Sequence, residues 1–211
     1  MSGYPCAGKT FRSKQLTEFF ESKIQASSDS QISKLSVHHI NDQSLGLSRD
    51  AYKEAKTEKD ARALEMSTVK RLLNRDSIVV ADGLNYIKGF RYQLYCEAKA
   101  VRTPSCVVHV GTPAQKCREH NERRLVDDQG RDSYQSDILD NLIFRYEEPN
   151  GMSRWDSPLF TVPIDDSTPP SQEIWNAMIG SDGQMKSAKP NAATVTVRAF
   201  VSVRTLRELM V

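Results

Sequence analysis

The sequence opens with the stretch Gly3-Tyr4-Pro5-Cys6-Ala7-Gly8-Lys9-Thr10, which fits the phosphate-loop pattern G-x-x-x-x-G-K-[ST] at every fixed position. Glycines let such a loop curl until successive backbone N–H groups point inward at phosphate oxygens. A helix predicted to follow the loop would direct the positive end of its dipole at the same anion. We therefore expect this loop to hold nucleotide phosphates, with Lys9 on the β- and γ-phosphates and the Thr10 hydroxyl on Mg²⁺.

Outward from the loop, short apolar runs alternate with segments of helical periodicity. Strands are predicted over about 34–40, 77–81, 106–110 and 159–164, and helices over about 9–25, 49–74, 89–100, 113–125, 136–146 and 171–179. The run Ile78-Val79-Val80-Ala81 is continuously apolar, which is typical of a strand buried on both faces. The alternation predicts an α/β fold with a parallel sheet flanked by helices.

Length and composition fit one domain with an appendage. The chain has 211 residues, 29 Lys+Arg against 27 Asp+Glu, a formal charge of +2 and 38% hydrophobic residues. This balance excludes a strongly basic nucleic-acid binder by bulk composition, although a local basic patch stays open. We assign residues 1–179 to the phosphate-loop domain and 180–211 to a linker and tail, in which 194–203 alternates like a strand.

Membrane and metal signatures are missing from the sequence. Its apolar runs fall far short of the ~20 residues that a helical span needs, and the N-terminus has no secretory signal, so no membrane partner is expected. Cys6, Cys96, Cys106 and Cys117 lack zinc-site spacing and are expected to be free thiols. A reducing cytoplasmic compartment, and also the nucleus, fits this cysteine usage.

One feature conflicts with the usual context of a phosphate loop. Such a loop leaves the carboxyl end of a buried strand, yet only Met1 and Ser2 precede it here. The prediction is that the central strand of the sheet is missing. The alternative is that another segment, such as 194–203, fills its place.

Two carboxylates end predicted strands at the edge where open α/β sheets bind ligands. Asp82 ends the strand 77–81 and is expected to bind the Mg²⁺ shell through water. Asp42 follows the strand 34–40 and suits a general base for water or a substrate hydroxyl, or else a solvated turn. His38 and His39 alternate across that strand and are interpreted as structural.

The helix near residues 115–125 is rich in arginine. A mobile helix of this kind closes over ATP in small phosphoryl-transfer enzymes and stabilises charge in the transition state. Arg123 and Arg124 are the first candidates because they lie nearest the polar break that follows the helix. The alternative is an ordinary solvated helix face, with Glu119 and Glu122 as partners.

Three stretches interleave aromatic and basic residues, namely 85–94, 145–150 and 154–160. Such residues can stack on bases and neutralise phosphates. They fit equally well as packed loops anchored by Trp155.

Together these segments resemble one family. The loop, Asp82 and the string Asn85-Tyr-Ile-Lys-Gly-Phe-Arg-Tyr-Gln-Leu-Tyr-Cys96 are similar to the killer toxin insensitivity protein number twelve family, whose members are Elongator-associated P-loop ATPases. Residues 145–160 form a second family-like stretch, and the resemblance covers about residues 3–179. The family is related to the kinase that phosphorylates seryl-tRNA on the selenocysteine route.

The resemblance implies a kinase-like P-loop NTPase fold that binds and hydrolyses ATP with Mg²⁺, contacts tRNA and supports Elongator in wobble-uridine modification. It places the nucleotide loop on Gly3 to Thr10 and the Walker B carboxylate on Asp82. Asp42 falls where the related kinase has a catalytic acidic residue. The lid region falls on Arg118, Arg123 and Arg124. Family members also carry a C-terminal helical domain implicated in tRNA binding, which residues 180–211 do not resemble.

Two rival functions remain open at this point. The first is an RNA or small-molecule kinase that uses the same loop. The second is a non-hydrolysing adaptor whose nucleotide only holds the fold. ATP is favoured over GTP because the sequence has no guanine-reading N/T-K-x-D pattern.

Overall fold

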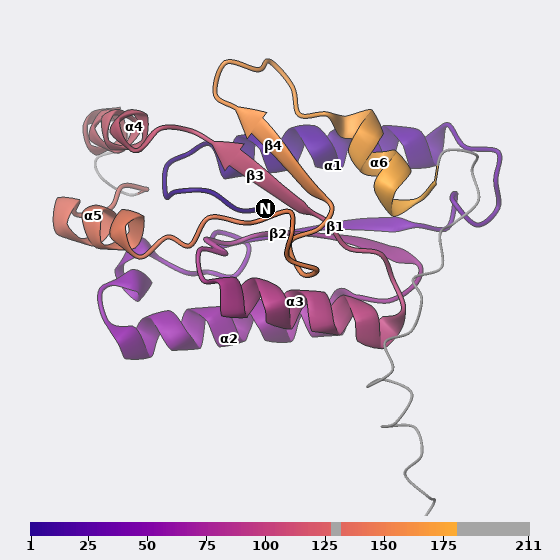
Figure 1. The fold of residues 1–211 in the computed structure, drawn as a ribbon, viewed down its shortest axis with the longest axis horizontal. Coiled ribbons are helices and arrows are strands. Elements are labelled where there is room, and N and C mark those ends of the chain that lie inside the picture. Colours follow the sequence, from indigo (N-terminus) through magenta and orange to yellow (C-terminus); the bar gives the residue numbers. More distant parts are fainter. Residues whose placement is uncertain (128–131, 181–211) are drawn as a thin grey trace, which may run out of the picture.

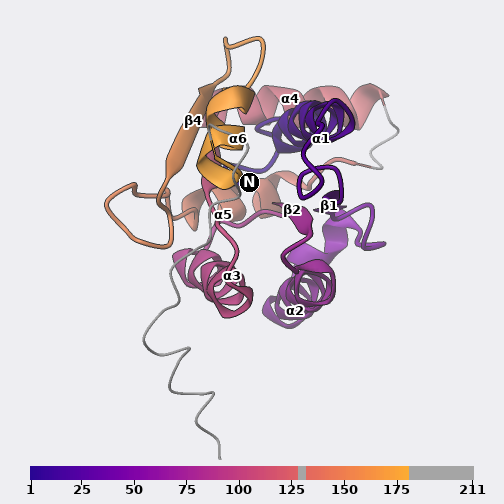
Figure 2. The same ribbon diagram turned by 90° about the vertical axis from the view of Figure 1, so that its right-hand side faces the viewer.

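A computed structural model describes residues 1–127 and 132–180. The strands are β1 (Ser36–Asn41), β2 (Ser77–Asp82), β3 (Val107–Gly111) and β4 (Leu159–Pro163), and the helices are α1 (Lys9–Gln25), α2 (Ala55–Leu72), α3 (Lys88–Val101), α4 (Ala114–Asp127), α5 (Ser136–Phe144) and α6 (Ser171–Met178). The strands form a central layer, with α1 and α6 on one face and α2 and α3 on the other (Figures 1 and 2). The predicted α/β fold is confirmed.

The sheet consists of two parallel halves. In one half β1 pairs with β2, from Ser36 opposite Ser77 to Asn41 opposite Asp82. In the other half β3 pairs with β4, beginning with Val107 opposite Leu159. The carboxyl ends of both halves meet at the loop, because Thr112 after β3 bonds to Ala7, and the loop shares a cavity with the two predicted carboxylates.

The first two residues join the halves. The Met1 ammonium donates to the Ala81 carbonyl at 2.8 Å on the β2 side. On the β3 side, the Ser2 amide donates to the Val108 carbonyl and the Val110 amide donates to the Ser2 carbonyl, both at 2.8 Å. At the place where the sequence predicts a missing strand, Met1 and Ser2 therefore connect the two halves at the loop end.

Behind Met1 the two halves are separated by an apolar cavity. Since Met1 and Ser2 bond to both halves, β2 and β3 stand about two inter-strand spacings, or ~9.6 Å, apart. The cavity measures about 160 Å³. Its lining includes Ile78, Val80, Cys106 and Val108. We call this junction between β2 and β3, from Met1 through the cavity behind it, the seam.

The main core lies between the sheet and the helices α1 and α6. Leu16, Phe20 and Ile24 recur every four residues along α1 and so face the same side of that helix. They pack against sheet residues such as Val162 and against Trp175 of α6. This packing fixes the first turn of α1, and with it the end of the phosphate loop.

The single long helix predicted over 49–74 is wrong. A 3-10 helix (Arg49–Tyr52) comes first, and Glu54 then adopts an extended backbone (φ −123°, ψ 144°) before α2 begins. The break leaves Tyr52 free to turn inward, where its side chain is buried and its hydroxyl reaches Asp42. The other predicted helices are found with small shifts of their ends.

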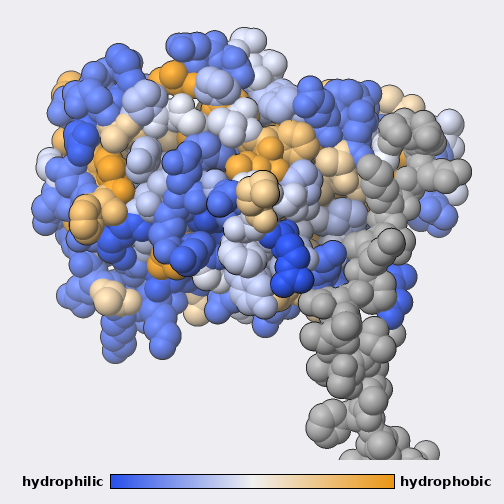
Figure 3. Space-filling model, in the orientation of Figure 1, coloured by the Kyte–Doolittle hydropathy of each residue, from blue (hydrophilic) through white to orange (hydrophobic). Residues whose placement is uncertain are grey.

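The remaining expectations concern the surface and the tail. No helix among residues 1–127 and 132–180 is long and apolar enough to cross a membrane, and the face in Figure 3 is mostly hydrophilic. All four cysteines are free. The predicted tail, including the strand at 194–203, lies outside the described residues except for Gly180.

Candidate functional site

The phosphate loop joins Ser2 to α1 by a backbone path that depends on glycine. Gly3 has φ +148°, and a Cβ there would lie 2.8 Å from the Val110 carbonyl oxygen. Gly8 precedes α1 with φ +92°, in the left-handed region. The Thr112 hydroxyl donates to the Ala7 carbonyl at 2.8 Å and ties the loop to the end of β3. These constraints leave the first N–H groups of α1 facing the cavity described below.

Lys9 is a buried cation at the centre of this loop. Its ammonium donates to the carbonyls of Gly3 (3.1 Å) and Tyr4 (2.8 Å). No carboxylate of the described residues lies within salt-bridge distance of it. Burial lowers the pKa of Lys9, while the charge of Asp82 acts in the opposite direction. A buried positive charge whose hydrogen-bond partners, in the described residues, are carbonyls suits an anionic ligand.

Asp82 ends β2 with a fully buried side chain. Its Oδ2 contacts His39 Nε2 at 3.0 Å, whereas its Oδ1 has no hydrogen-bond partner among the described residues. Thr10 lines the same cavity. The described residues contain no cluster of three His, Cys, Asp or Glu side chains able to cage a metal. One carboxylate and one hydroxyl fit Mg²⁺, which keeps waters and takes phosphate oxygens as further ligands.

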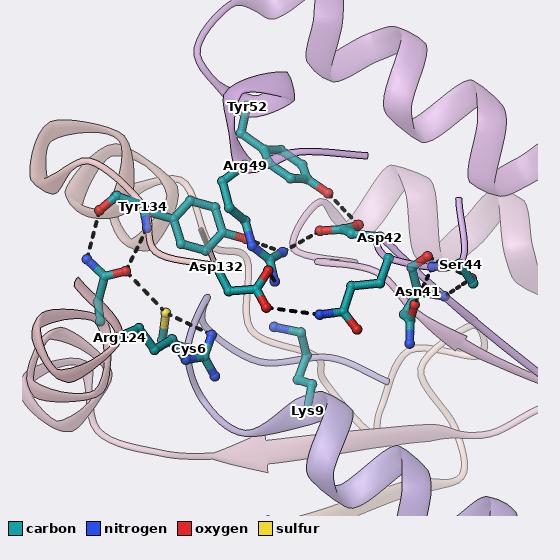
Figure 4. Close-up of polar contacts among 12 residues, drawn as sticks. Cys6, Lys9, Asn41, Asp42, Ser44, Arg49, Tyr52, Arg124, Asp132 and Tyr134 are labelled. Carbon is teal, nitrogen blue, oxygen red and sulfur yellow. Dashed lines mark hydrogen bonds and ion pairs between the residues drawn. The ribbon is translucent and has the colours of Figure 1, made fainter. Parts of the chain in front are cut away.

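Asp42 is held in place by two partners (Figure 4). Arg49 Nη1 lies 2.6 Å from its Oδ2, and the Tyr52 hydroxyl donates to its Oδ1 at 2.9 Å. Burial raises the pKa of Asp42, and the charge of Arg49 opposes this. The carboxylate is therefore fixed in orientation and faces the cavity.

These groups share one polar cavity of about 290 Å³. Its walls come from three parts of the fold: the loop and α1, the segments at the ends of β1 and β2, and the α4–α5 region. The lining includes Lys9, Thr10, Asp42, Asp82, Arg49, Arg124, Asp132 and Tyr134. The sequence-predicted loop and both predicted carboxylates are thus brought together.

The predicted arginines separate into two groups. Arg124 lines the cavity, and its Nη1 lies 3.8 Å from the Cys6 sulfur. Arg118 instead pairs with Asp140 at 2.8 Å on the surface. Arg123 is exposed. In this arrangement only Arg124 adjoins the loop, and the roles of Arg118 and Arg123 stay predictions.

Several residues around the site were not predicted. Arg49 lies over the Tyr134 ring, 5.0 Å from its centroid, and its Nη1 donates to the Tyr134 hydroxyl at 3.1 Å. Gln43 donates to Asp132 at 3.0 Å, joining the end of β1 to the segment before α5. His39, interpreted as structural, positions Asp82. A sequence signal existed only for His39, which sits near the end of a strand pairing with the one that carries Asp82.

The aromatic and basic stretches pack against one another. Arg91 forms a buried pair with Asp156 (Nε to Oδ1, 2.7 Å), and its Nη1 donates to the carbonyls of Asn85 and Glu147. Arg145 pairs with buried Glu58 at 2.9 Å. These contacts favour the packed-loop interpretation, because the basic groups that they involve already have partners.

The fold and the site together define the class of this protein. A parallel sheet, a glycine-bounded loop leading into α1, and a buried carboxylate at the end of the neighbouring strand are the parts of a P-loop NTPase fold. A family model described as "Chromatin associated protein KTI12" matches residues 1–210. The chain belongs to this family.

Individual relatives agree with this assignment. The chain is 46% identical over 209 residues to Protein kti12 of Schizosaccharomyces pombe, covering 99% of the chain and 70% of that relative. It is 39% identical over 195 residues to Protein KTI12 homolog of Danio rerio, and covers 64% of it. The chain thus spans about two thirds of the length of these relatives.

A solved structure has the same fold. The crystal structure of Chaetomium thermophilum Kti12 in complex with ADP-AlF3 matches with a TM-score of 0.75 and 46% identity, over 84% of this chain and 96% of that one.

Proposed function

We propose that this chain binds Mg²⁺-ATP at the Gly3–Thr10 loop and hydrolyses it, in support of wobble-uridine modification of tRNA by Elongator. One observation carries the proposal. Buried Lys9, the oriented Asp42 carboxylate, and an Asp82 Oδ1 that has no partner in the described part of the chain all face one polar cavity. The relative solved with ADP-AlF3 supports a nucleotide as the ligand.

In the proposed hydrolysis, the residues of the site have different roles. Backbone N–H groups of the loop and the Lys9 ammonium hold the phosphates and neutralise charge that develops on the transferring group. Thr10 and Asp82 would hold Mg²⁺, which supplies further charge neutralisation at the β- and γ-phosphates. Asp42 orients the attacking water, and Arg124 is the lid arginine nearest the loop. The products are ADP and inorganic phosphate.

The experiment is phosphate release from ATP by the full chain and by Lys9→Ala. We expect a loss of at least about 100-fold, because Lys9 contacts the group whose charge changes. Lys70→Ala is the matched control, since Lys70 is an exposed lysine of α2 that pairs with Glu97. Turnover retained in Lys9→Ala would contradict hydrolysis at this loop.

The tRNA and Elongator links rest on family membership, and they are tested separately. Phosphate release is measured with and without bulk tRNA. Stimulation would connect the loop to RNA within these 211 residues. Hydrolysis that ignores tRNA would contradict RNA sensing by this chain alone. Co-purification with tagged Elongator tests the protein partner.

A second candidate is phosphoryl transfer to a hydroxyl group. The observation that favours it is the orientation of Asp42 by Arg49 and Tyr52, which suits a base that accepts a hydroxyl proton. Labelled γ-phosphate recovered on tRNA, instead of free phosphate alone, would support it. Tight ATP binding with negligible turnover would instead support a non-hydrolysing adaptor.

A further inference from the structure

An exposed aromatic ring borders the polar cavity and has no role in the chemistry derived so far. Phe11 follows Lys9 and Thr10 on the first turn of α1 and lines the same cavity. Its side chain is 61% exposed, although large apolar side chains are usually buried. A phenylalanine that stays exposed beside a loop for phosphates has a flat face available to a ligand.

The ring is held by an anchored neighbour. The Arg12 guanidinium carbon lies 5.4 Å from the Phe11 ring centroid, in a cation–π arrangement. Arg12 itself is buried and donates to the carbonyls of Ser167 (2.8 Å) and Asp166. Both carbonyls belong to the segment between β4 and α6. Through Arg12 the Phe11 ring is therefore linked to the segment between β4 and α6.

The positions of the two carboxylates indicate how a nucleotide would be oriented in the cavity. Asp42 follows β1 and Asp82 ends β2, in the half-sheet on the opposite side of the loop from β4. Those carboxylates serve the γ-phosphate end of a nucleotide. The α-phosphate and its nucleoside must then leave the loop away from them, past the first turn of α1, which carries Phe11.

We propose that Phe11 is the stacking surface for the nucleobase, a conclusion that rests on the proposed binding of ATP. The ring stacks on the base, while Arg12 fixes its plane from the loop between β4 and α6. Because every base has a π-face, stacking of this kind adds affinity without reading hydrogen-bonding edges. Phe11 therefore contributes to the binding of adenine and guanine nucleotides alike, and adds nothing to the binding of a ligand without a base.

The test compares a nucleotide with a base-free ligand. Dissociation constants for Mg²⁺-ATP, Mg²⁺-GTP and Mg²⁺-tripolyphosphate are measured by calorimetry on the full chain and on Phe11→Ala, Phe11→Trp and Phe144→Ala. We expect Phe11→Ala to weaken ATP and GTP about fivefold or more and to leave tripolyphosphate unchanged. Phe11→Trp should restore binding of both nucleotides. Phe144→Ala removes another exposed phenylalanine, outside the cavity lining, and serves as the control.

The possible results distinguish base stacking by Phe11 from the proposed binding of ATP on which it rests. Unchanged ATP binding in Phe11→Ala would overturn base stacking and leave nucleotide binding intact. Equal weakening of ATP and tripolyphosphate would also overturn stacking, because it would show a change in the loop. Wild-type chain that binds none of the three ligands would overturn the proposed function, and this proposal with it.

Discussion

Asp42 shows how neighbouring side chains set the character of one group in this site. Burial favours its neutral form and raises its pKa, whereas Arg49 and the Tyr52 hydroxyl stabilise the carboxylate. The pair with Arg49 also fixes the direction in which its oxygens point. An acid in this state combines orientation with enough basicity to accept a proton.

Replacing Asp42 with Asn should separate chemistry from binding. Asn retains the shape of Asp and can accept a hydrogen bond from the Tyr52 hydroxyl. It has no negative charge, however, and cannot act as a base that takes up a proton. We expect kcat for ATP hydrolysis to fall about 100-fold or more with little change in KM. Steady-state kinetics checks this. Asp50→Asn, on the exposed side of the same 3-10 helix, is the control, and a pure KM effect in Asp42→Asn would contradict the assigned role.

The position of a residue in the site was predictable from sequence where the signal is local. The loop, Asp82 and Asp42 are marked by short patterns at strand ends, and they do share one cavity. Arg49 and Tyr134 are 85 positions apart, so only the folded chain brings the guanidinium over the ring. No spacing rule encodes such a contact.

Among the elements, α2 carries an unusual buried group. Glu65 lies behind Gly83, so close that a Cβ on Gly83 would be 2.2 Å from its Oε2. Its Oε1 has no partner among the described residues. Burial raises the pKa of Glu65 to about 7, and the nearby charge of Asp42 adds to this. Its ordinary value, near 4.5, applies in the unfolded chain.

This difference predicts a pH-dependent cost to stability. Between about pH 4.5 and 7 the folded chain keeps the Glu65 proton and the unfolded chain loses it, so the free energy of unfolding falls as pH rises. Above pH 7 the cost levels off at about 3 kcal/mol. Glu65→Gln should remove it.

Urea denaturation at pH 5 and pH 8 measures the effect. We expect Glu65→Gln to gain stability over wild type by more at pH 8 than at pH 5, and exposed Glu21→Gln to show no such trend. The same stability difference between Glu65→Gln and wild type at both pH values would contradict a raised pKa.

Helices and strands were largely predictable because periodicity is a local signal. The helix at Lys9–Gln25 agrees with the prediction at both ends. The failure at 49–74 has a tertiary cause: burial of Tyr52 and its bond to Asp42 outweigh continuous helix through Glu54. Propensity alone contains no information about that contact.

At the scale of the whole molecule, the two half-sheets are joined at the loop end by Met1 and Ser2. The sequence predicted a missing strand. It could not show that Met1 and Ser2 bond to both halves, because this bridging depends on backbone hydrogen bonds and not on side-chain pattern.

Filling the seam should stabilise the fold. A variant with four β-branched residues added before Met1 would extend into the cavity lined by Ile78 and Val108. We expect its free energy of unfolding to exceed that of wild type by about 2 kcal/mol or more, from buried apolar surface. Guanidinium denaturation measures this. A four-residue Gly-Ser extension controls for loss of the buried Met1 charge, and equal stability of the two extended chains would contradict the prediction.

The seam also links ligand binding to folding. The loop follows Ser2, whereas Asp82 ends β2, so a ligand held by both spans the junction between the half-sheets. Such a ligand binds the chain when the two half-sheets are joined at the seam and not when they are separated. By mass action the ligand then raises the free energy of unfolding of the domain. At concentrations well above the dissociation constant, the rise is proportional to the logarithm of the ratio of ligand concentration to dissociation constant. Reciprocally, any change that holds the two half-sheets together increases the affinity for that ligand.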